Sequence, residues 1–183
     1  MLNILDCTLR DGGYYNNWNF DSSLVDGYLR AMEECPVSYV ELGFRFNSSD
    51  SSFGPFGSTT EEFLNSLELP SSLKYAVMIN GKEFLRSNED ELKTLVEKNF
   101  VPANKSKISL VRVAINFDKA HETKSLIKII SRLGYKVGLN LMQSNGKSES
   151  DYFAISKEIQ AWNTVDILYF ADSFGNMDPD DIR

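Results

Sequence analysis

A segment near the amino terminus, DCTLRDGG at residues 6–13, places several reactive groups at the end of a predicted strand, Leu2–Leu9. Asp11 offers hard carboxylate oxygens to a divalent cation. Arg10 offers a planar, permanently charged donor fork to a carboxylate or to a developing enolate. The two glycines that follow let the backbone turn and let a ligand approach closely. Taken alone, these residues also fit an Arg–Asp ion pair that ties down a loop.

The longer stretch LDCTLRDGG, residues 5–13, closely resembles the D-x-T-L-R-D-G signature of a metal-dependent superfamily. That superfamily contains pyruvate aldolases, hydroxymethylglutaryl-CoA lyases and isopropylmalate synthases, and the chain looks most like its 4-hydroxy-2-oxovalerate aldolase branch. Further segments resemble the family's strand ends in the same order: Val40–Gly43, Arg112–Ala114 and Ala171–Met177. The resemblance covers the whole chain and implies a TIM barrel with its site at the carboxyl-terminal face of the strands.

The resemblance implies roles for the matching residues of the first two strands. Asp11 would coordinate Mn²⁺ or Mg²⁺ as the divalent metal cofactor. Arg10 would stabilise the pyruvate enolate and contact the carboxylate of the oxo acid, both as catalytic and as substrate-binding residue. Asp6 and Glu41 would orient Arg10 or the waters on the metal, with Glu41 counted among the catalytic groups. Metal and guanidinium together would meet the negative charge that develops on the enolate oxygen.

Polar side chains at the ends of the fifth and sixth strands would complete the site. The resemblance implies that Asp172 and Ser173 face the substrate, with Asp172 acting catalytically. Asn140 and Gln143 lie at the end of an otherwise apolar strand, which predicts that they line the site and bind substrate. The aromatic run at residues 14–20 either packs as a loop over the barrel mouth or forms a wall of the pocket.

Two features depart from the family pattern. Tyr14 occupies the position where the aldolase branch has a histidine proposed as the catalytic base, and a tyrosine, with an ordinary pKa near 10, is a poorer base at neutral pH. Either Tyr14 acts with a water, or another group acts, or the substrate differs. The family's remaining metal ligands, a His-x-His pair on the seventh strand, are expected beyond Arg183. The single histidine, His121, lies in a Lys- and Glu-rich helical region and is predicted to be a surface residue.

The elements that must position these groups alternate between strand and helix. Strands are predicted at residues 2–9, 37–44, 73–79, 108–117, 136–142 and 165–171, and helices at residues 22–35, 59–67, 89–98, 119–133 and 148–162. Asn88 is expected to cap the third helix, with Glu91 at the capping-box position, and Gly134 to end the fourth. Since no tight hairpin joins adjacent strands, parallel pairing through crossovers follows. An open doubly wound sheet and a barrel both fit this pattern. The long loop at residues 45–58 follows a strand end, where such folds place binding sites.

With the resemblance, the expected fold is an α/β TIM (β/α)8-type barrel truncated after about six βα units. Residues 1–183 would form a single, incomplete domain. We expect either that these residues belong to a longer natural chain or that an oligomeric partner covers the gap, because the outer strands would otherwise be open edges. A homo-oligomer is therefore possible.

Composition excludes several classes of function. The 183 residues are 42% hydrophobic and 25% charged, which is ordinary for a globular protein. A net charge of −7 disfavours nucleic acid or an anionic membrane as partner. No secretory signal and no apolar stretch long enough to cross a bilayer is recognisable, so a cytoplasmic protein is expected. The two cysteines are far apart and predict neither a disulfide framework nor a structural zinc site.

The leading functional prediction is a divalent-metal-dependent carbon–carbon lyase, an aldolase that acts on a 2-oxo acid or its aldol adduct through an enolate. Its small-molecule partners would be a 2-oxo acid and an aldehyde. One alternative is a synthase of the same superfamily that condenses an acyl-CoA with an oxo acid. The other is a non-catalytic barrel fragment that serves as a binding or assembly module, because one carboxylate alone makes a weak cation site.

Overall fold

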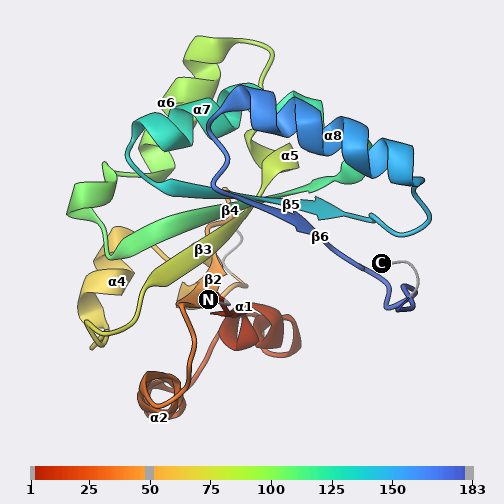
Figure 1. The fold of residues 1–183 in the computed structure, drawn as a ribbon. Helices are drawn as coiled ribbons and strands as arrows, with labels where there is room; N and C mark the ends of the chain where they lie inside the picture. Colours follow the sequence, from red (N-terminus) through yellow and green to blue (C-terminus); the bar gives the residue numbers. More distant parts are fainter. Residues whose placement is uncertain (1–2, 48–51, 180–183) are drawn as a thin grey trace.

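The computed structural model describes residues 3–47 and 52–179, in which six parallel strands form one curled sheet (Figure 1). The strands lie side by side in chain order, so each new strand joins the same edge of the sheet. They are β1 (Leu5–Asp6), β2 (Tyr39–Phe44), β3 (Tyr75–Asn80), β4 (Ile108–Asn116), β5 (Lys136–Met142) and β6 (Ile167–Phe170). The result is a half-barrel, which confirms the predicted α/β class and parallel pairing.

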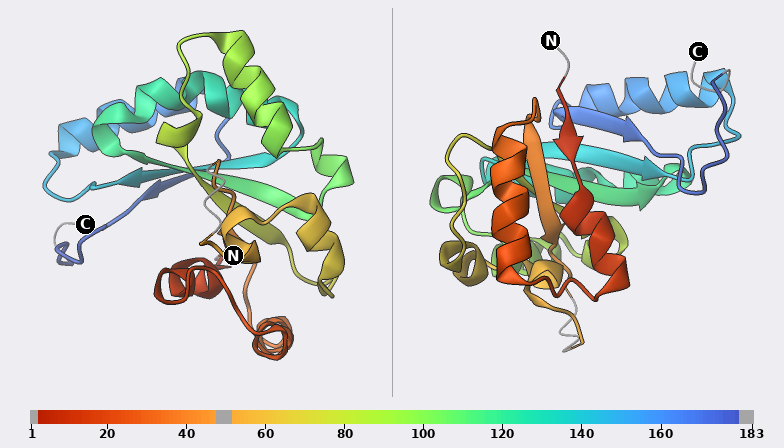
Figure 2. Two further views of the ribbon diagram at one scale, coloured as in Figure 1. Left: turned by 180° about the vertical axis from the view of Figure 1, so that it is seen from behind. Right: turned by 90° about the horizontal axis from the view of Figure 1, so that it is seen from below.

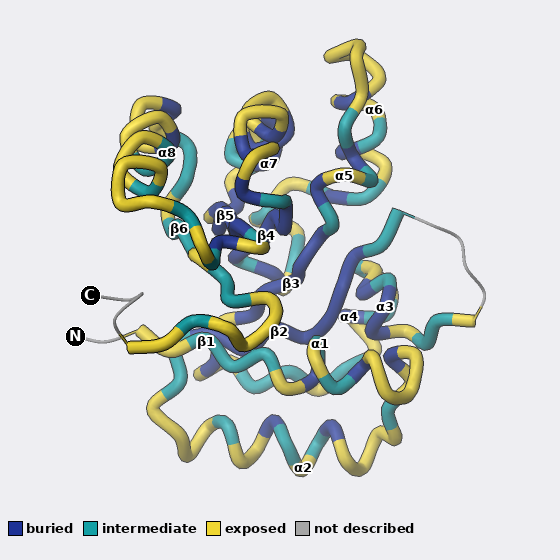
Figure 3. The backbone as a smooth tube through the Cα atoms, turned by 90° about the vertical axis from the view of Figure 1, so that its right-hand side faces the viewer, coloured by how far each residue is buried: buried dark blue, intermediate teal, exposed yellow. Residues whose placement is uncertain are grey.

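Helices cover the outer, convex face of this sheet (Figures 1 and 3). The α-helices are α1 (Thr8–Gly12), α2 (Ser22–Glu33), α3 (Pro55–Ser58), α4 (Glu61–Ser66), α5 (Gly81–Phe84), α6 (Glu89–Asn99), α7 (Lys124–Arg132) and α8 (Glu149–Trp162), and the 3-10 helices are η1 (Gly13–Tyr15), η2 (Ala103–Lys105) and η3 (Phe117–Thr123). Figure 2 shows α1 directly after β1 and beside β2, apart from the layer formed by α6, α7 and α8. None of the helices in the described part of the chain has the length and apolar character needed to span a membrane.

The two faces of the sheet are buried in different ways. On the outer face, strand residues pack with the apolar sides of the helices into one large core, to which α7 contributes Leu126, Ile127, Ile129 and Ile130. On the inner face, Tyr39, Ala76 and Leu110 form a smaller apolar cluster together with Leu5 and Ile167. Strands buried on both faces have nearly continuous apolar sequences, as β3 and β4 do.

Local signals fix the ends of the longer helices. Asn88 caps α6 by accepting hydrogen bonds from the backbone of Asp90 and Glu91, as predicted, although without a reciprocal bond from the Glu91 side chain. Gly134 follows α7 with a φ of +92°, which confirms it as the residue that ends this helix. Ser148 and Asp151 form a full capping box at the start of α8.

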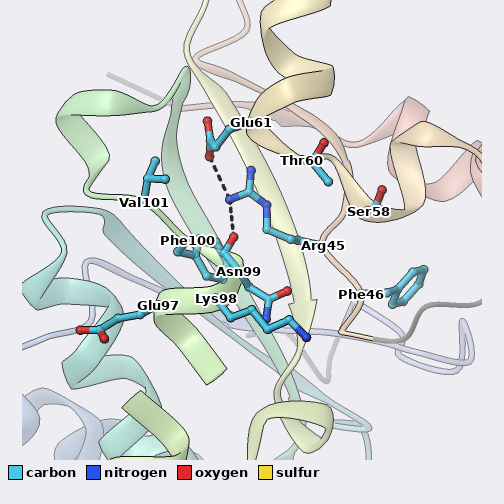
Figure 4. A pocket seen from close by; sticks show the side chains of 10 residues that line it. All are labelled: Arg45, Phe46, Ser58, Thr60, Glu61, Glu97, Lys98, Asn99, Phe100 and Val101. Carbon is cyan, nitrogen blue, oxygen red and sulfur yellow. Dashed lines mark hydrogen bonds and ion pairs between the residues drawn. The ribbon is translucent and has the colours of Figure 1, made fainter. Parts of the chain in front are cut away.

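The long loop after β2 is anchored by Arg45, whose side chain is buried between α4 and α6 (Figure 4). Its Nε and Nη2 donate to the Thr59 carbonyl at 3.1 and 2.6 Å, and its Nη1 donates to the Asn99 carbonyl at 3.1 Å. The same Nη1 pairs with Glu61 at 3.1 Å. Burial lowers the pKa of Arg45, and Glu61 opposes this shift. Arg45 lines a cavity of about 300 Å³. Because its guanidinium nitrogens already bond to the protein, Arg45 has a structural role there.

Several predicted boundaries were wrong. Within the described residues, which exclude Leu2 of the prediction, the first strand covers only Leu5–Asp6, and the motif continues as helix α1 instead of a strand and turn. The helix predicted at residues 119–133 begins as 3-10 helix η3 and becomes α-helical at Lys124. The short helices α3 and α5 were not predicted. His121 is exposed in η3, as expected, and both cysteines are free.

Gly43 offers a test of how the loop is held against β2. A Cβ atom at this position would lie 2.0 Å from the carbonyl oxygen of Phe56, which is backbone of α3 and cannot turn aside. We expect Gly43→Ala to lower the free energy of unfolding by about 2–3 kcal/mol in urea titrations, in the upper range for overpacking. Gly27→Ala is the matched control, because nothing lies within 4 Å of its Cβ and alanine favours the helix α2. Equal stability of the two variants would contradict this packing.

Candidate active site

Helix α1 begins at Thr8, after the N-cap residue Cys7, and Asp6 holds its first residue from just before the cap. The Asp6 carboxylate accepts a hydrogen bond from the Thr8 backbone at 3.0 Å and another from the Thr8 hydroxyl at 3.2 Å. The Tyr28 hydroxyl of α2 also donates to Asp6, and burial together with this bond raises the pKa of Tyr28. Asp6 thus starts α1 and joins it to α2. Among the described residues it makes no hydrogen bond to Arg10, and its implied role toward the waters on a metal stays a prediction.

Trp18 holds the other end of α1. Its indole Nε1 donates to the Arg10 carbonyl at 2.9 Å, and its ring occupies the space above Gly13, where a Cβ would lie 2.0 Å from the indole Cδ1. Trp18 has a φ of +58°, a left-handed conformation that is unfavourable for a bulky side chain. Gly13 and Gly12 have φ values of −59° and −61°. Gly13 therefore serves to admit the indole, and neither glycine turns the backbone through a positive φ as predicted.

A single buried carboxylate links the two arginines of the site. Glu41 is fully buried on β2, and its Oε2 accepts a hydrogen bond from Arg10 Nε and another from Arg112 Nη1, both at 2.8 Å. Burial is the largest single influence on Arg10 and lowers its pKa, but the charge and hydrogen bond of Glu41 together with the charge of Asp11 outweigh it, so the net shift is upward. Both guanidinium groups are charged, and α1 is thereby fastened to the centre of the sheet.

Arg112 is held from three sides. Besides Glu41, it donates through Nη2 to the Asn140 side-chain oxygen at 2.9 Å, and its guanidinium lies 4.4 Å from the centre of the Tyr169 ring. Two atoms of this cluster, Glu41 Oε1 and Arg112 Nε, are buried without a hydrogen-bond partner among the described residues. Unsatisfied buried polar atoms are rare and cluster at functional positions.

Asp11 is the more accessible member of the Arg10–Asp11 pair, with its side chain 54% exposed. Its Oδ1 pairs with Arg10 Nη1, and its Oδ2 accepts a hydrogen bond from the Cys7 thiol at 3.1 Å. Burial and this hydrogen bond raise the pKa of Cys7 to about 11, so the thiol remains protonated at neutral pH and acts as a donor. No group of three His, Cys, Asp or Glu side chains suited to hold a metal occurs within residues 3–47 and 52–179.

These groups open into a cavity of about 520 Å³ at the carboxyl ends of the strands, here called the mouth cavity. Six of the eight predicted site residues line it: Arg10, Asp11, Tyr14, Asn140, Asp172 and Ser173. Glu41 lies buried behind the two arginines. Gln143 is exposed and does not line the cavity, although its backbone N–H donates to Ser173 Oγ at 3.0 Å. The structure thus brings seven of the predicted residues together and leaves Gln143 beside them.

Asp172 is occupied by the turn that follows β6. Its carboxylate accepts hydrogen bonds from the backbone N–H groups of Met177 at 2.8 Å and Asn176 at 3.0 Å. These bonds hold the pKa of Asp172 below its usual value. The geometry gives Asp172 an ionised, turn-stabilising role, and its predicted catalytic role stays a prediction.

Sequence reasoning missed part of the site. Arg112 was noted within a matching strand segment but received no role, although a charge inside the apolar run of β4 is itself a signal for an inward-facing functional group. The cavity also contains an apolar side that was not predicted from the strand ends, formed by Phe44, Phe46, Met78 and Met142.

Comparison with solved structures places this chain beside part of a known one. No model of a known protein family matches the sequence, and no curated protein matches it. The chain is similar to the crystal structure of the N-terminal domain of a putative aldolase from Bacteroides vulgatus, with 33% identity and a TM-score of 0.79. The similarity covers 99% of this chain and 57% of the other, so this chain spans little more than half the length of that one. This supports the aldolase resemblance in general terms, while the superfamily and its branch stay predictions.

Glu41→Gln tests the buried charge cluster. The substitution keeps the shape of the side chain but leaves Arg10 and Arg112 without their shared counter-charge, so we expect the free energy of unfolding to fall by about 3–5 kcal/mol. The measurement is urea unfolding followed by circular dichroism. Glu97→Gln, which removes an exposed pair with Lys93, is the matched control and should change stability by less than about 0.5 kcal/mol. If the two variants unfold at the same urea concentration, Glu41 does not hold α1 against the sheet as described.

Proposed function

We propose that the full gene product containing this chain is a carbon–carbon lyase, an aldolase that cleaves or forms an aldol adduct of a 2-oxo acid. The observation that carries the proposal is the position of Arg10 and Asp11, side by side at the mouth cavity with Arg10 fixed from behind by Glu41. The similarity to an aldolase N-terminal domain supports the same class of reaction. The proposed complete fold is a closed (β/α)8 barrel, of which this half-barrel supplies the first strands.

Arg10 would bind the oxo acid and stabilise its enolate. Its Nε and Nη1 are engaged by Glu41 and Asp11, which leaves Nη2 without a hydrogen-bond partner among the described residues. A guanidinium held in this way needs little reorganisation to meet charge that develops on a keto oxygen. Arg10 lines the cavity, where its free donor can reach a ligand.

Asp11 fits a hard divalent cation in its chemistry, because a half-exposed carboxylate supplies the oxygen ligands that Mg²⁺ and Mn²⁺ prefer. One carboxylate is a weak site by itself, so the remaining ligands would have to come from residues outside the described ones. When bound, a divalent cation would supply Lewis acidity that polarises the keto group of the substrate. Asp11 would hold this cation next to Arg10.

Tyr14 would move the proton of the aldol hydroxyl. Its side chain is 63% exposed at the cavity, and its hydroxyl has no hydrogen-bond partner among the described residues. In cleavage, the substrate hydroxyl would pass its proton to a water beside Tyr14, whose hydroxyl would accept it while releasing its own proton to solvent; the bond between C3 and C4 breaks, an aldehyde leaves, and the enolate takes a proton from solvent at C3. Asn140 and Ser173 would contact the oxo acid from the opposite side of the cavity.

A non-catalytic barrel module is the second candidate. It is favoured by the lack of a three-residue metal cluster in the described part of the chain and by β1 and β6, each of which pairs with only one neighbour in the described sheet. Such strand edges invite association. A synthase that condenses an acyl-CoA remains an alternative from the sequence alone.

Substitutions of Arg10 and Asp11 in the full gene product test the proposal. Arg10→Lys keeps the charge but loses the donor fork, and we expect kcat/KM for pyruvate and an aldehyde to fall about 100- to 1,000-fold, as for the loss of one donor to a developing oxyanion. Asp11→Asn should weaken Mn²⁺ binding at least about tenfold by calorimetry. Arg86→Lys, in an exposed turn, is the matched control and should retain full activity. Wild-type turnover in either site variant would count decisively against the assignment.

A further inference from the structure

The mouth cavity has a polar side and an aromatic side. The aromatic side consists of Tyr14 from η1, Phe44 at the end of β2, and Phe46 just beyond it. The rings of Phe44 and Phe46 are stacked, with their centres 4.4 Å apart and their planes at 9°. Tyr14 meets Phe44 edge to face at 6.1 Å. The three rings form a continuous surface next to Arg10, whose guanidinium lies 5.6 Å from the Phe44 ring centre.

This surface is backed by a second row of rings. Trp18 packs edge to face against Tyr14 at 4.8 Å and against Phe46 at 5.2 Å. Phe53 lies 5.1 Å from Phe46. Trp18 is itself fixed by its hydrogen bond to Arg10. The aromatic side is therefore a supported wall and not a set of independent surface residues.

The wall is only partly covered by the protein. Tyr14 is 63% exposed and Phe46 is half-buried, whereas Phe44 and Trp18, which support them, are each 4% exposed. Met78 and Met142 extend the apolar lining with flexible thioether side chains. Exposed aromatic surface within a cavity that also has fixed polar groups is suited to an apolar part of a ligand.

The charges of the cavity argue against a phosphorylated ligand. The cationic side chains that line it are Arg10 and Arg112, and both are already bonded to Glu41. The lining also contains two carboxylates, Asp11 and Asp172. The one free donor of Arg10 is assigned to the oxo acid, so the phosphates of a CoA thioester or a sugar phosphate would meet no further uncommitted cation among the described lining residues.

We propose that the acceptor half of the substrate carries a flat, uncharged aryl group that packs against the exposed ring surfaces of Tyr14 and Phe46, with the buried Phe44 ring supporting them from behind. The inference rests on the proposed function and names its substrate class: a 4-aryl-4-hydroxy-2-oxobutanoate that is cleaved to, or formed from, pyruvate and an aromatic aldehyde. In the direction of synthesis, C3 of pyruvate loses a proton and bonds to the aldehyde carbon, and the aldehyde oxygen gains a proton. Phe46 would determine the preference for an aromatic aldehyde, and it takes no part in the proposed proton transfer or metal binding.

The first test compares acceptors for the full gene product with Mn²⁺ and pyruvate. We expect kcat/KM for benzaldehyde to exceed that for acetaldehyde about tenfold, with no use of glyceraldehyde 3-phosphate or acetyl-CoA. Phe46→Ala should lower the ratio of kcat/KM for benzaldehyde to kcat/KM for acetaldehyde about tenfold. Phe63→Ala is the matched control, because this ring packs against Phe56 away from the cavity. A preference for acetaldehyde, for the phosphorylated aldehyde or for the thioester overturns the inference.

Binding keeps the inference testable without turnover. 4-Phenyl-2-oxobutanoate combines the oxo acid with an aryl group and should bind about tenfold more tightly than pyruvate by calorimetry, an advantage that Phe46→Ala removes. Equal affinities would overturn the aryl assignment. Exchange of the pyruvate methyl protons with deuterium in D2O, followed by NMR without any aldehyde, reports on the proposed function separately. Exchange without aryl preference refutes only the inference, whereas aryl preference in binding without exchange refutes only the aldolase activity.

Discussion

The buried carboxylate of Glu41 is the interaction on which the candidate site depends. A fully buried charge is tolerated only when it is paired, and Glu41 is paired with guanidinium groups from two different elements, α1 and β4. Arg10 and Arg112 are separated by about a hundred residues of sequence, so one oxygen atom determines how the amino-terminal segment lies across the inner face of the sheet. The curl of the sheet makes this possible, because in a flat sheet β4 would be too far from the helix that follows β1.

Glycines accommodate the large side chains of this cluster. A Cβ at Gly138 on β5 would lie 3.0 Å from Arg112 Cγ and 3.1 Å from Tyr169 Cε2, so a larger residue would disturb the contact between guanidinium and ring. Gly13 makes room for the Trp18 indole in the same way. In both places the requirement arises from a neighbouring side chain and not from the backbone conformation. Gly134, with its positive φ, is the contrasting case in which the backbone itself requires glycine.

The sequence predicted the sheet better than the segment that carries the chemistry. In strands β3, β4 and β5 apolar residues occupy nearly all successive positions, and this pattern indicates burial on both faces. Helix α1 is too short to show a helical periodicity, and it depends on the local bond between Asp6 and Thr8 and on the tertiary contact with Trp18. A search for a period of 3.6 residues likewise could not distinguish the 3-10 helix η3 from the α-helix α7 that follows it.

The same distinction applies to the site. Most predicted residues line the mouth cavity because parallel strands present their carboxyl ends together, which a sequence can reveal. Gln143 was misplaced for a simple reason: it lies three residues after Asn140, and alternation along a strand assigns such residues to opposite faces. Its left-handed φ of +57° then ends the strand geometry. The partners of Arg112 could not be derived, because a pairing between strands requires the register of the sheet.

The energetics of the cluster favour a functional explanation over a purely structural one. Buried ion pairs can often be replaced by apolar groups without loss of stability, so the arrangement of Glu41 with two arginines is not the most stable filling of this space. Glu41 Oε1 and Arg112 Nε each lack a partner among the described residues, at a cost of about 1–3 kcal/mol for an unsatisfied buried group. Arg112 also lies between the mouth cavity and a larger cavity of about 840 Å³ at the amino-terminal end of the strands. Glu41 and Arg112 therefore contribute more to the orientation of Arg10 than to the stability of the fold. A reaction that develops negative charge requires a cation held in a fixed orientation.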